Sequence, residues 1–329
     1  MRAIALLSLV SLPLSAAAEP APSPEEILAA HVDVLETQGK DPLAFVRQRL
    51  DEVDLILFDD AWHPVVEPFD FYQALLRDPA SRERLDFVFV EAFAVNHQPT
   101  LDRFFAAPQE NVHLLAPMLQ DDLSGHGWAL ATYVDLLRTV YRVNAELPAG
   151  QRLRVVAVND PVYWSALETP EDLAIFRQSL VGNDYGMYRK ILASMEDFES
   201  GKKGIFLTNT RHAYKGIRGA NGRLFWNCGT FFAQWHPGRT SSIRFHHLML
   251  TIRKEVDPGD QATSTAGLER YDYRFERVAG GLWDEAFAVH GNRPVAFDLD
   301  GTPFGALPYA GNHMHQAAPG QTLLDANDS

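Results

Sequence analysis

Four short apolar segments, separated by stretches long enough to hold helices, constrain the fold of this chain most strongly. They cover residues 53–58, 86–90, 153–158 and 204–207. Runs this short and this apolar are typical of strands that are buried on both faces. Strands that alternate with helices of ten or more residues form a largely parallel sheet. We therefore predict an α/β fold, with a mostly parallel mixed sheet and helices on both of its faces.

The segments between these strands carry helix signals. Ser23-Pro24-Glu25-Glu26 combines an N-cap serine, a proline in the first turn and a glutamate three residues after the cap, which predicts a helix start. Weaker apolar runs predict two more strands, at 241–246 and 294–297. The expected helices cover 23–37, 41–51, 70–77, a short stretch from Gln98, 128–146, and 169–195 with a break near Gly182.

The first 18 residues have the layout of a secretory signal peptide. Met1-Arg2 gives a positive start, an uncharged and mostly apolar stretch follows to Ser15, and Ala16-Ala17-Ala18 supplies small residues at the cleavage position. We predict cleavage after Ala18 and a periplasmic or secreted protein. The alternative is an uncleaved membrane anchor, for which the apolar stretch is short.

The rest of the chain is expected to form one domain. We place it at 19–315, with a core at 53–214 and a C-terminal extension at 220–315, followed by a polar tail at 316–329. No segment after the signal peptide reaches 18 consecutive apolar residues, so no membrane span is predicted.

Charge and cysteine content narrow the classes of partner. The chain has 29 Lys and Arg against 43 Asp and Glu, a net charge of −14. Nucleic-acid binding requires a basic surface, so we expect no nucleic-acid partner. The single cysteine, Cys228, allows no internal disulfide and no cysteine-rich zinc site. A small-molecule substrate or ligand is the remaining expectation.

Histidines and carboxylates follow all four predicted strands. Asp60 and His63 follow the first, Glu91 the second, Asp160 the third and His212 the fourth. Ligands of open α/β sheets bind at the carboxyl ends of the strands. Any one of these residues alone would be read as a solvated loop residue. Their convergence at four strand ends predicts a functional site.

Two chemistries suit this set of side chains. A histidine oriented by a carboxylate is a general base. Two histidines with carboxylates also form a divalent-metal site that lowers the pKa of bound water. The sequence leaves both open. The candidate catalytic residues are His63, His212, Asp60, Glu91, Asp160 and Asp184, and the candidate metal ligands are His63, Glu91 and His212.

Asp184 differs from the others because it lies on a predicted helix. Residues 187, 188 and 191 share its helix face, and Met187 and Ile191 are apolar, so we expect this face to pack on the sheet. A carboxylate on a buried face needs a partner. We expect Asp184 to pair with an arginine, preferably Arg211, or with a site histidine. The alternative is an exposed position where the helix begins.

The order of these motifs resembles a superfamily that includes erythromycin-esterase-like, ChaN-like and TraB/Tiki proteins. Its pattern is approximately Gly-Glu-x-x-His, a strand-end Glu, an Arg-Asp-x-x-Met helix and Gly-x-x-His. This chain has Asp60-x-x-His63, Glu91, Asn183-Asp184-x-x-Met187 and Thr210-Arg211-His212 in the same order. It departs from the pattern in having Asp59-Asp60 for Gly-Glu and Asn183 for the arginine, and in lacking the last glycine.

Together with the strand-end cluster, the resemblance implies a hydrolase, esterase-like or metal-assisted, and the N-terminal segment predicts that it is exported. The ChaN-like branch of the resemblance implies an alternative, a periplasmic haem- or metal-binding protein without catalysis. For haem, Tyr214 is the candidate axial ligand, and its other interpretation is a packing aromatic next to the fourth strand. A third interpretation is a structural envelope protein that keeps the polar cluster as a relic.

Overall fold

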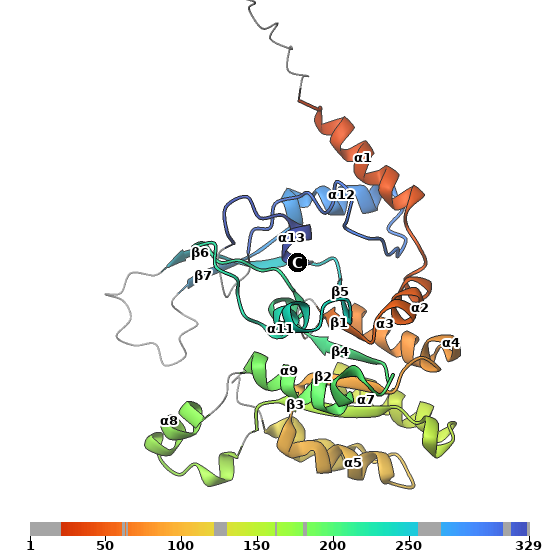
Figure 1. The fold of residues 1–329 in the computed structure, drawn as a ribbon, viewed down its shortest axis with the longest axis vertical. Helices are drawn as coiled ribbons and strands as arrows, with labels where there is room; N and C mark the ends of the chain where they lie inside the picture. The colour runs from red at the N-terminus through yellow and green to blue at the C-terminus, as the bar shows by residue number, and fades with distance from the viewer. Residues whose placement is uncertain are drawn as a thin grey trace, which may run out of the picture.

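A five-stranded, all-parallel sheet forms the centre of this computed structural model (Figure 1). Its strand order is β3-β2-β4-β1-β5, and a separate antiparallel pair, β6-β7, lies outside it. The α/β fold predicted from the sequence is thus confirmed. The residues that the structure describes are 21–60, 63, 65–121, 130–161, 163–179, 183–255, 271–311 and 317–327.

Helices follow most of the strands along the chain. The strands are β1 (Leu55–Asp59), β2 (Phe87–Ala94), β3 (Arg154–Asn159), β4 (Gly204–Thr208), β5 (Thr240–Arg244), β6 (Met249–Glu255) and β7 (Tyr271–Glu276). The helices are α1 (Pro24–Thr37), α2 (Pro42–Glu52), α3 (Val66–Arg77), α4 (Pro79–Arg82), α5 (Gln98–Ala106), α6 (Ala116–Gln120), α7 (Ala131–Ala145), α8 (Pro170–Ser179), α9 (Asn183–Ser194), α10 (Thr210–Ala213), α11 (Cys228–Trp235), α12 (Leu282–Val289) and α13 (Leu323–Asn327).

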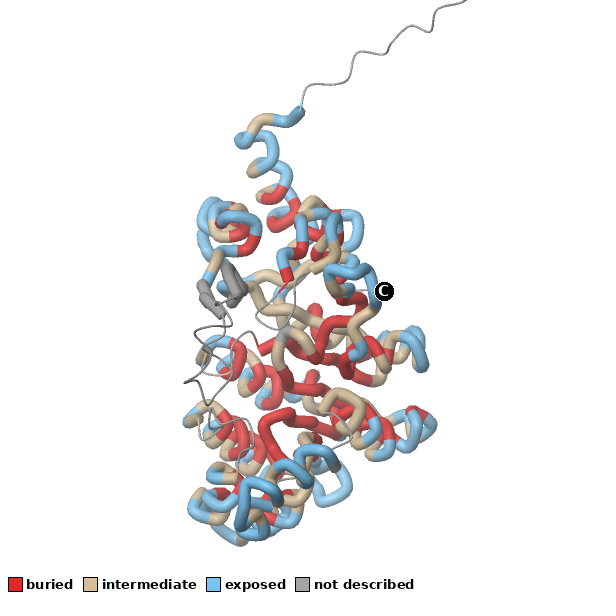
Figure 2. Tube along the Cα trace, turned by 90° about the vertical axis from the view of Figure 1, so that its left-hand side faces the viewer, coloured by how far each residue is buried: buried red, intermediate tan, exposed pale blue. Residues whose placement is uncertain are grey.

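The sheet separates two hydrophobic cores, because successive side chains of a strand point to opposite faces. In β1, Leu55 and Leu57 pack in one core with α1, α9, α11, α12 and α13. Ile56 and Phe58 pack in the other core with α2, α3, α5, α6 and α7. Figure 2 shows the buried residues as a continuous interior with exposed residues on the outer turns. Both faces of the sheet are therefore covered by helices, as the sequence predicted.

The start of α1 agrees with its sequence signal. The Ser23 hydroxyl accepts a hydrogen bond from the Glu26 backbone N–H, and the Glu26 carboxylate accepts one from the Ser23 backbone N–H. These reciprocal bonds satisfy donors that a helix start otherwise leaves unpaired. The helix ends at Thr37, as expected, and packs along α12 at one end of the molecule (Figure 1).

Strand β2 extends further than the sequence indicated. We expected it to end at Glu91, but it continues to Ala94 and all eight of its residues are buried. Its pairing with β3 shifts register between Val90 and Ala94. Such an irregularity re-aims the side chains around it. Glu91 therefore lies where regular pairing stops, close to the carboxyl ends of the neighbouring strands.

Two expectations for the C-terminal region are wrong. Residues 294–297 form no strand; Ala296 makes a single antiparallel bridge with Lys40, in the turn between α1 and α2. The predicted polar tail contains α13, whose Leu323 and Ala326 are fully buried. A reciprocal cap between Thr322 and Asp325 begins this helix. The signal was therefore present in the sequence as a capping box.

No helix among the described residues is long and apolar enough to cross a membrane. The predicted signal peptide and its cleavage position after Ala18 lie outside the described residues.

The packing of α13 leads to a stability prediction. Leu323 is fully buried, so Leu323→Ala removes packed methyl groups and leaves a cavity. We expect the free energy of unfolding to fall by about 2–4 kcal/mol. Leu248→Ala is the matched control, because 51% of Leu248 is exposed, and it should change stability by less than about 0.5 kcal/mol. Urea unfolding measures both; equal effects would contradict the docked helix.

Candidate functional site

The carboxyl ends of β1, β2 and β4 bring most of the predicted site residues together. The backbone N–H of Asp60 donates to Thr208 O over 2.8 Å, which joins the end of β1 to the end of β4. Glu91 approaches from β2 and contacts the same segment of β4 through Thr208 and Asn209. Parallel pairing in this order therefore assembles the site from residues far apart in the sequence.

His63 and Asp60 form one half of the site. The Nδ1 atom of His63 lies 2.8 Å from Oδ2 of Asp60. The Asp60 side chain is 1% exposed, whereas 18% of the His63 side chain is exposed. Burial raises the pKa of Asp60, although the charge of His63 opposes this. Burial lowers the pKa of His63, but the Asp60 carboxylate more than offsets it, so the net shift is upward.

The second nitrogen of His63 faces the carboxamide of Asn209. Nδ2 of Asn209 lies 3.2 Å from Nε2 of His63. With the Nδ1 proton donated to Asp60, Nε2 carries the lone pair and accepts from the Asn209 amide. This arrangement selects one tautomer of the neutral ring. The Tyr133 hydroxyl lies 3.3 Å from Nδ1, and burial raises its pKa well above the usual value, so it stays protonated.

His212 forms the other half of the site and is fully buried. Its Nδ1 lies 2.6 Å from Oδ1 of Asp184, and its Nε2 lies 3.2 Å from Oε1 of Glu91. Burial lowers the pKa of His212, but the charges of Asp184 and Glu91 outweigh this and raise the pKa to about 9. His212 is therefore an imidazolium at neutral pH.

Arg211 competes with Glu91 for the same nitrogen of His212. The Nε of Arg211 is 2.9 Å from Nε2 of His212 and would donate to it only if that nitrogen carried a lone pair. A protonated ring instead donates Nε2–H to Glu91. The carboxylates of Asp184 and Glu91 lie on both sides of the His212 ring, and together they outweigh the one guanidinium of Arg211. The protonated form of His212 therefore dominates. Arg211 then contributes a second positive charge beside the ring.

Glu91 accepts from three directions. The Thr208 hydroxyl and the Asn209 backbone N–H donate to Oε2, and His212 lies against Oε1. Burial raises the pKa of Glu91. The charge and the hydrogen bond of His212 have the larger, opposite effect, so the pKa lies far below the usual value for a glutamate. Glu91 is therefore a fixed anion that holds His212, and its oxygens are already committed.

Asp184 is held where α9 begins, as the sequence analysis expected for a paired carboxylate. Its partner is His212, and the preferred partner, Arg211, instead contacts the ring of His212. The backbone N–H of Cys228, at the start of α11, also donates to Oδ1 over 2.8 Å. The start of α11 packs so closely against the backbone of Tyr214 that position 229 has to be glycine, because a Cβ there would lie 2.5 Å from the Tyr214 carbonyl oxygen.

Two predicted residues lie outside this cluster. Asp160 is half-buried at the end of β3; burial, and then the charge of Asp184, raise its pKa. No hydrogen bond that the described residues show joins its carboxylate to His63 or His212. Tyr214 is fully buried and its hydroxyl donates to Asp59 over 3.0 Å. It is thus a packing aromatic, the other interpretation that its sequence position allowed.

Neither candidate cofactor fits these residues as they lie. No group of three or more His, Cys, Asp or Glu side chains in the described part of the chain is arranged to hold a metal ion. His63, Glu91 and His212 are not such a group, because both ring nitrogens of His212 face carboxylates directly. For haem, the Tyr214 hydroxyl is engaged with Asp59 in the core.

Sequence reasoning missed Asn209 and Tyr133. Asn209 directly follows β4 and could have been found by the strand-end rule that identified the others. Tyr133 lies on α7, 70 residues after His63. It carries no local signal, because an aromatic residue on an apolar helix face is ordinarily part of the core.

Comparisons with known proteins show likeness at the level of structure. No family model and no curated protein matches the chain. A Bacillus cereus protein is 12% identical with a TM-score of 0.47, covering 71% of this chain and 82% of its own. An erythromycin esterase in its open conformation has the same identity and TM-score, covering 71% of this chain and 79% of its own. A succinoglycan biosynthesis protein is 10% identical with a TM-score of 0.48, covering 67% and 75%.

An erythromycin esterase, one of the classes that the sequence motifs resemble, is thus among the solved structures similar to this chain. What the site does follows from its own geometry.

The charged state of His212 leads to a pH prediction. Its pKa rises from 6.5 to about 9 on folding, so the stability it contributes is complete below pH 6.5 and is lost as pH rises toward 9. Asp184→Asn keeps the hydrogen bonds but removes the largest favourable charge. We expect it to shrink the fall in unfolding free energy between pH 6.5 and 9.5 by on the order of 1–3 kcal/mol.

The control for this prediction is Asp160→Asn. It removes a neighbouring carboxylate that does not bond to the ring, and it should leave the fall in stability unchanged. Urea unfolding at several pH values measures all three proteins. An unchanged pH dependence in Asp184→Asn would show that His212 is neutral in the folded protein.

Proposed function

We propose that this protein is an exported hydrolase that cleaves an ester-type bond with water activated by His63. The observation that carries the proposal is the Asp60–His63 pair, in which a buried carboxylate orients a histidine that remains partly exposed. A base oriented in this way takes a proton from water, and the carboxylate stabilises the imidazolium that forms.

The two histidines have different roles in this proposal. His63 can be reached from solvent, whereas His212 is fully buried and bracketed by carboxylates. Only His63 is therefore placed to meet a water molecule and a substrate. His212 and Arg211 supply fixed positive charge beside it, which favours the negative charge that develops on a carbonyl oxygen during acyl transfer.

Water is the nucleophile that the site favours. The Thr208 hydroxyl donates to Glu91, and burial raises the pKa of the Cys228 thiol well above its usual value. Neither group is activated for attack, because a nucleophile needs an adjacent base or a lowered pKa. In this proposal the attacking water takes the place of the Asn209 amide at Nε2 of His63. The lone pair of this nitrogen then receives the proton of the water.

The kinetic test compares His63→Ala, Asp60→Asn and the wild type on a panel of small aryl and alkyl esters. His63→Ala removes the base and should lower kcat/KM by about 10²–10⁴-fold. His113→Ala, a substitution of an exposed histidine, should retain the wild-type rate. Full activity in His63→Ala on every hydrolysed ester would remove His63 from the mechanism.

The pH dependence of the rate separates a base from a structural residue. The neutral ring is the active form, and the pKa of His63 lies above its usual value of 6.5 because of Asp60. The rate should therefore rise with pH through a midpoint above 6.5, and Asp60→Asn should move that midpoint downward. A midpoint that does not respond to Asp60→Asn would exclude the pair as the source of the base.

Export is the part of the proposal that rests on the N-terminal sequence alone. The charged start, apolar stretch and alanine triplet support cleavage after Ala18. When the full chain is expressed in a Gram-negative host, the mature protein should begin at Glu19 and occur in the periplasmic fraction. N-terminal sequencing checks this, and an intact Met1 on a cytoplasmic product would contradict it.

A further inference from the structure

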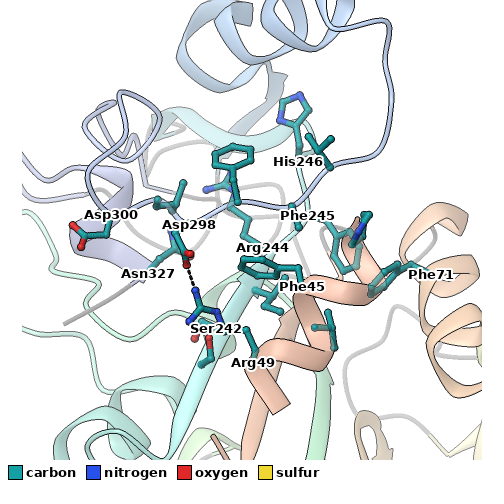
Figure 3. Close-up of a pocket in the computed structure, with 18 of the residues that line it drawn as sticks. Phe45, Arg49, Phe71, Ser242, Arg244, Phe245, His246, Asp298, Asp300 and Asn327 are labelled. Carbon is teal, nitrogen blue, oxygen red and sulfur yellow. Dashed lines mark hydrogen bonds and ion pairs between the residues drawn. The ribbon is translucent and has the colours of Figure 1, made fainter. Parts of the chain in front are cut away.

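A cavity of about 640 Å³ lies beside the edge strand β5, on the side away from β1. Figure 3 shows Phe45 and Arg49 of α2, Ser242 and Arg244 of β5, and Asp298 of the C-terminal segment around one space. Its volume is in the range of small-molecule sites. The His63 and His212 cluster does not line it.

The walls of the cavity are mainly apolar. α2 and α3 contribute one side, β5 the floor, and α12 with the segment after it the other side. A ligand here would bury an aliphatic or aromatic body. The apolar lining residues include Phe45, Phe71, Ile243, Phe245, Trp283 and Phe297.

Arg244 makes this cavity unusual. Both of its terminal guanidinium nitrogens are buried, and neither has a hydrogen-bond partner. The ring of Tyr214, 5.7 Å from its Cζ, is the one compensating contact shown among the described residues. Buried charges in proteins are normally paired and hydrogen-bonded. An unpartnered guanidinium beside an apolar cavity points to an anion that is bound there.

The neighbouring groups strengthen this interpretation. The indole Nε1–H of Trp283 is a buried donor without a partner, and Trp283 lines the cavity. Nδ1 of His246 is also unpartnered, but Nε2 of this ring faces Asp284 and burial lowers its pKa, so Nδ1 is an acceptor and offers nothing to an anion. The His246 ring stacks on Trp283 at 5.2 Å. Unsatisfied polar atoms are few in native proteins. Arg244 and Trp283 therefore form a pair of unpartnered donors beside one cavity, available to an anionic ligand.

The other charged residues of the lining set the charge of that ligand. Arg49 is paired with Asp298 and Glu52, and Lys215 donates to Thr240 O. Three carboxylates also line the cavity, on Glu67, Asp298 and Asp300. A dianion such as a phosphate monoester would meet their repulsion. A single carboxylate matches one guanidinium, which can bind it with two parallel hydrogen bonds.

We propose that this cavity binds an apolar carboxylic acid, whose carboxylate pairs with Arg244 and whose hydrocarbon body lies between α2, β5 and α12. The site is separate from the His63 site and stands or falls independently of the hydrolase proposal. In the parallel pairing of β1 with β5, Arg244 lies opposite Asp59. The carboxylate of the ligand would thus be bound at β5, the strand next to β1, level with the carboxyl end of β1.

The test is calorimetric titration of the full chain with decanoate, with decan-1-ol as the uncharged probe of the same length. Decanoate should bind one per chain and at least about tenfold more tightly than decan-1-ol, the difference that about 1.4 kcal/mol produces. Arg244→Met keeps an unbranched apolar stem but removes the guanidinium and its charge. It should weaken decanoate at least about tenfold and leave decan-1-ol within about twofold.

Arg49→Met is the matched control, because Arg49 lines the same cavity but is already paired. It should leave decanoate binding within about twofold of the wild type. Arg244→Met should also melt at the wild-type temperature or higher, since it removes a buried charge that has no partner. A lower melting temperature would show that Arg244 has a structural partner and would overturn the proposal.

Three other results would also overturn it. These are no decanoate binding up to its solubility limit, equal binding of decanoate and decan-1-ol, and equal loss of decanoate binding in Arg244→Met and Arg49→Met. Inorganic phosphate is the final probe. Phosphate binding that depends on Arg244, without decanoate binding, would assign the site to a different anion.

Discussion

The buried imidazolium of His212 is the interaction on which the rest of the site depends. It lies between Asp184 and Glu91 with no exposed surface. Removing it would leave two carboxylates without their charge partner, and breaking a buried pair in this way is strongly destabilising. The ends of β2 and β4 and the starts of α9 and α11 therefore have to remain where they are.

The same network separates two histidines that look alike in the sequence. His212 receives two carboxylates and is charged. His63 receives one, Asp60, and keeps an exposed edge. Environments that differ in this way are how one site provides a fixed positive charge and a titrating base at the same pH. The distinction comes from the partners of each ring, which lie on other elements.

The sequence predicted the sheet well and named most of the residues that lie together at the candidate site. Strands buried on both faces consist mainly of apolar residues, and β1, β2 and β4 are apolar up to the polar residues near their carboxyl ends. The capping residues of α1 and α2 are likewise local signals. The strand-end rule found Asp60, Glu91 and His212 because parallel strands share one carboxyl edge. These inferences needed only local pattern and topology.

The remaining errors concern long-range partners. The sequence could not show that Asp184 pairs with His212 rather than Arg211, since that choice depends on how α9 and α11 approach each other. It could not identify Tyr133, which reaches the site from α7. The C-terminal segment was predicted to be a polar tail. Thr322 and Asp325 do signal the start of a helix, but only the docked position of α13 shows that its apolar residues are buried. Tertiary contacts decide such cases.

Titration of the two imidazoles by NMR tests the central claim most directly. Isotope-labelled protein, with His63→Gln and His212→Gln to assign the signals, gives both protonation states across pH 5 to 10. The account predicts that His212 is charged at neutral pH and titrates near 9, while His63 has its own midpoint above 6.5 that falls in Asp60→Asn. A His212 that is neutral at pH 7, or a His63 midpoint that ignores Asp60, would contradict the division of roles between them.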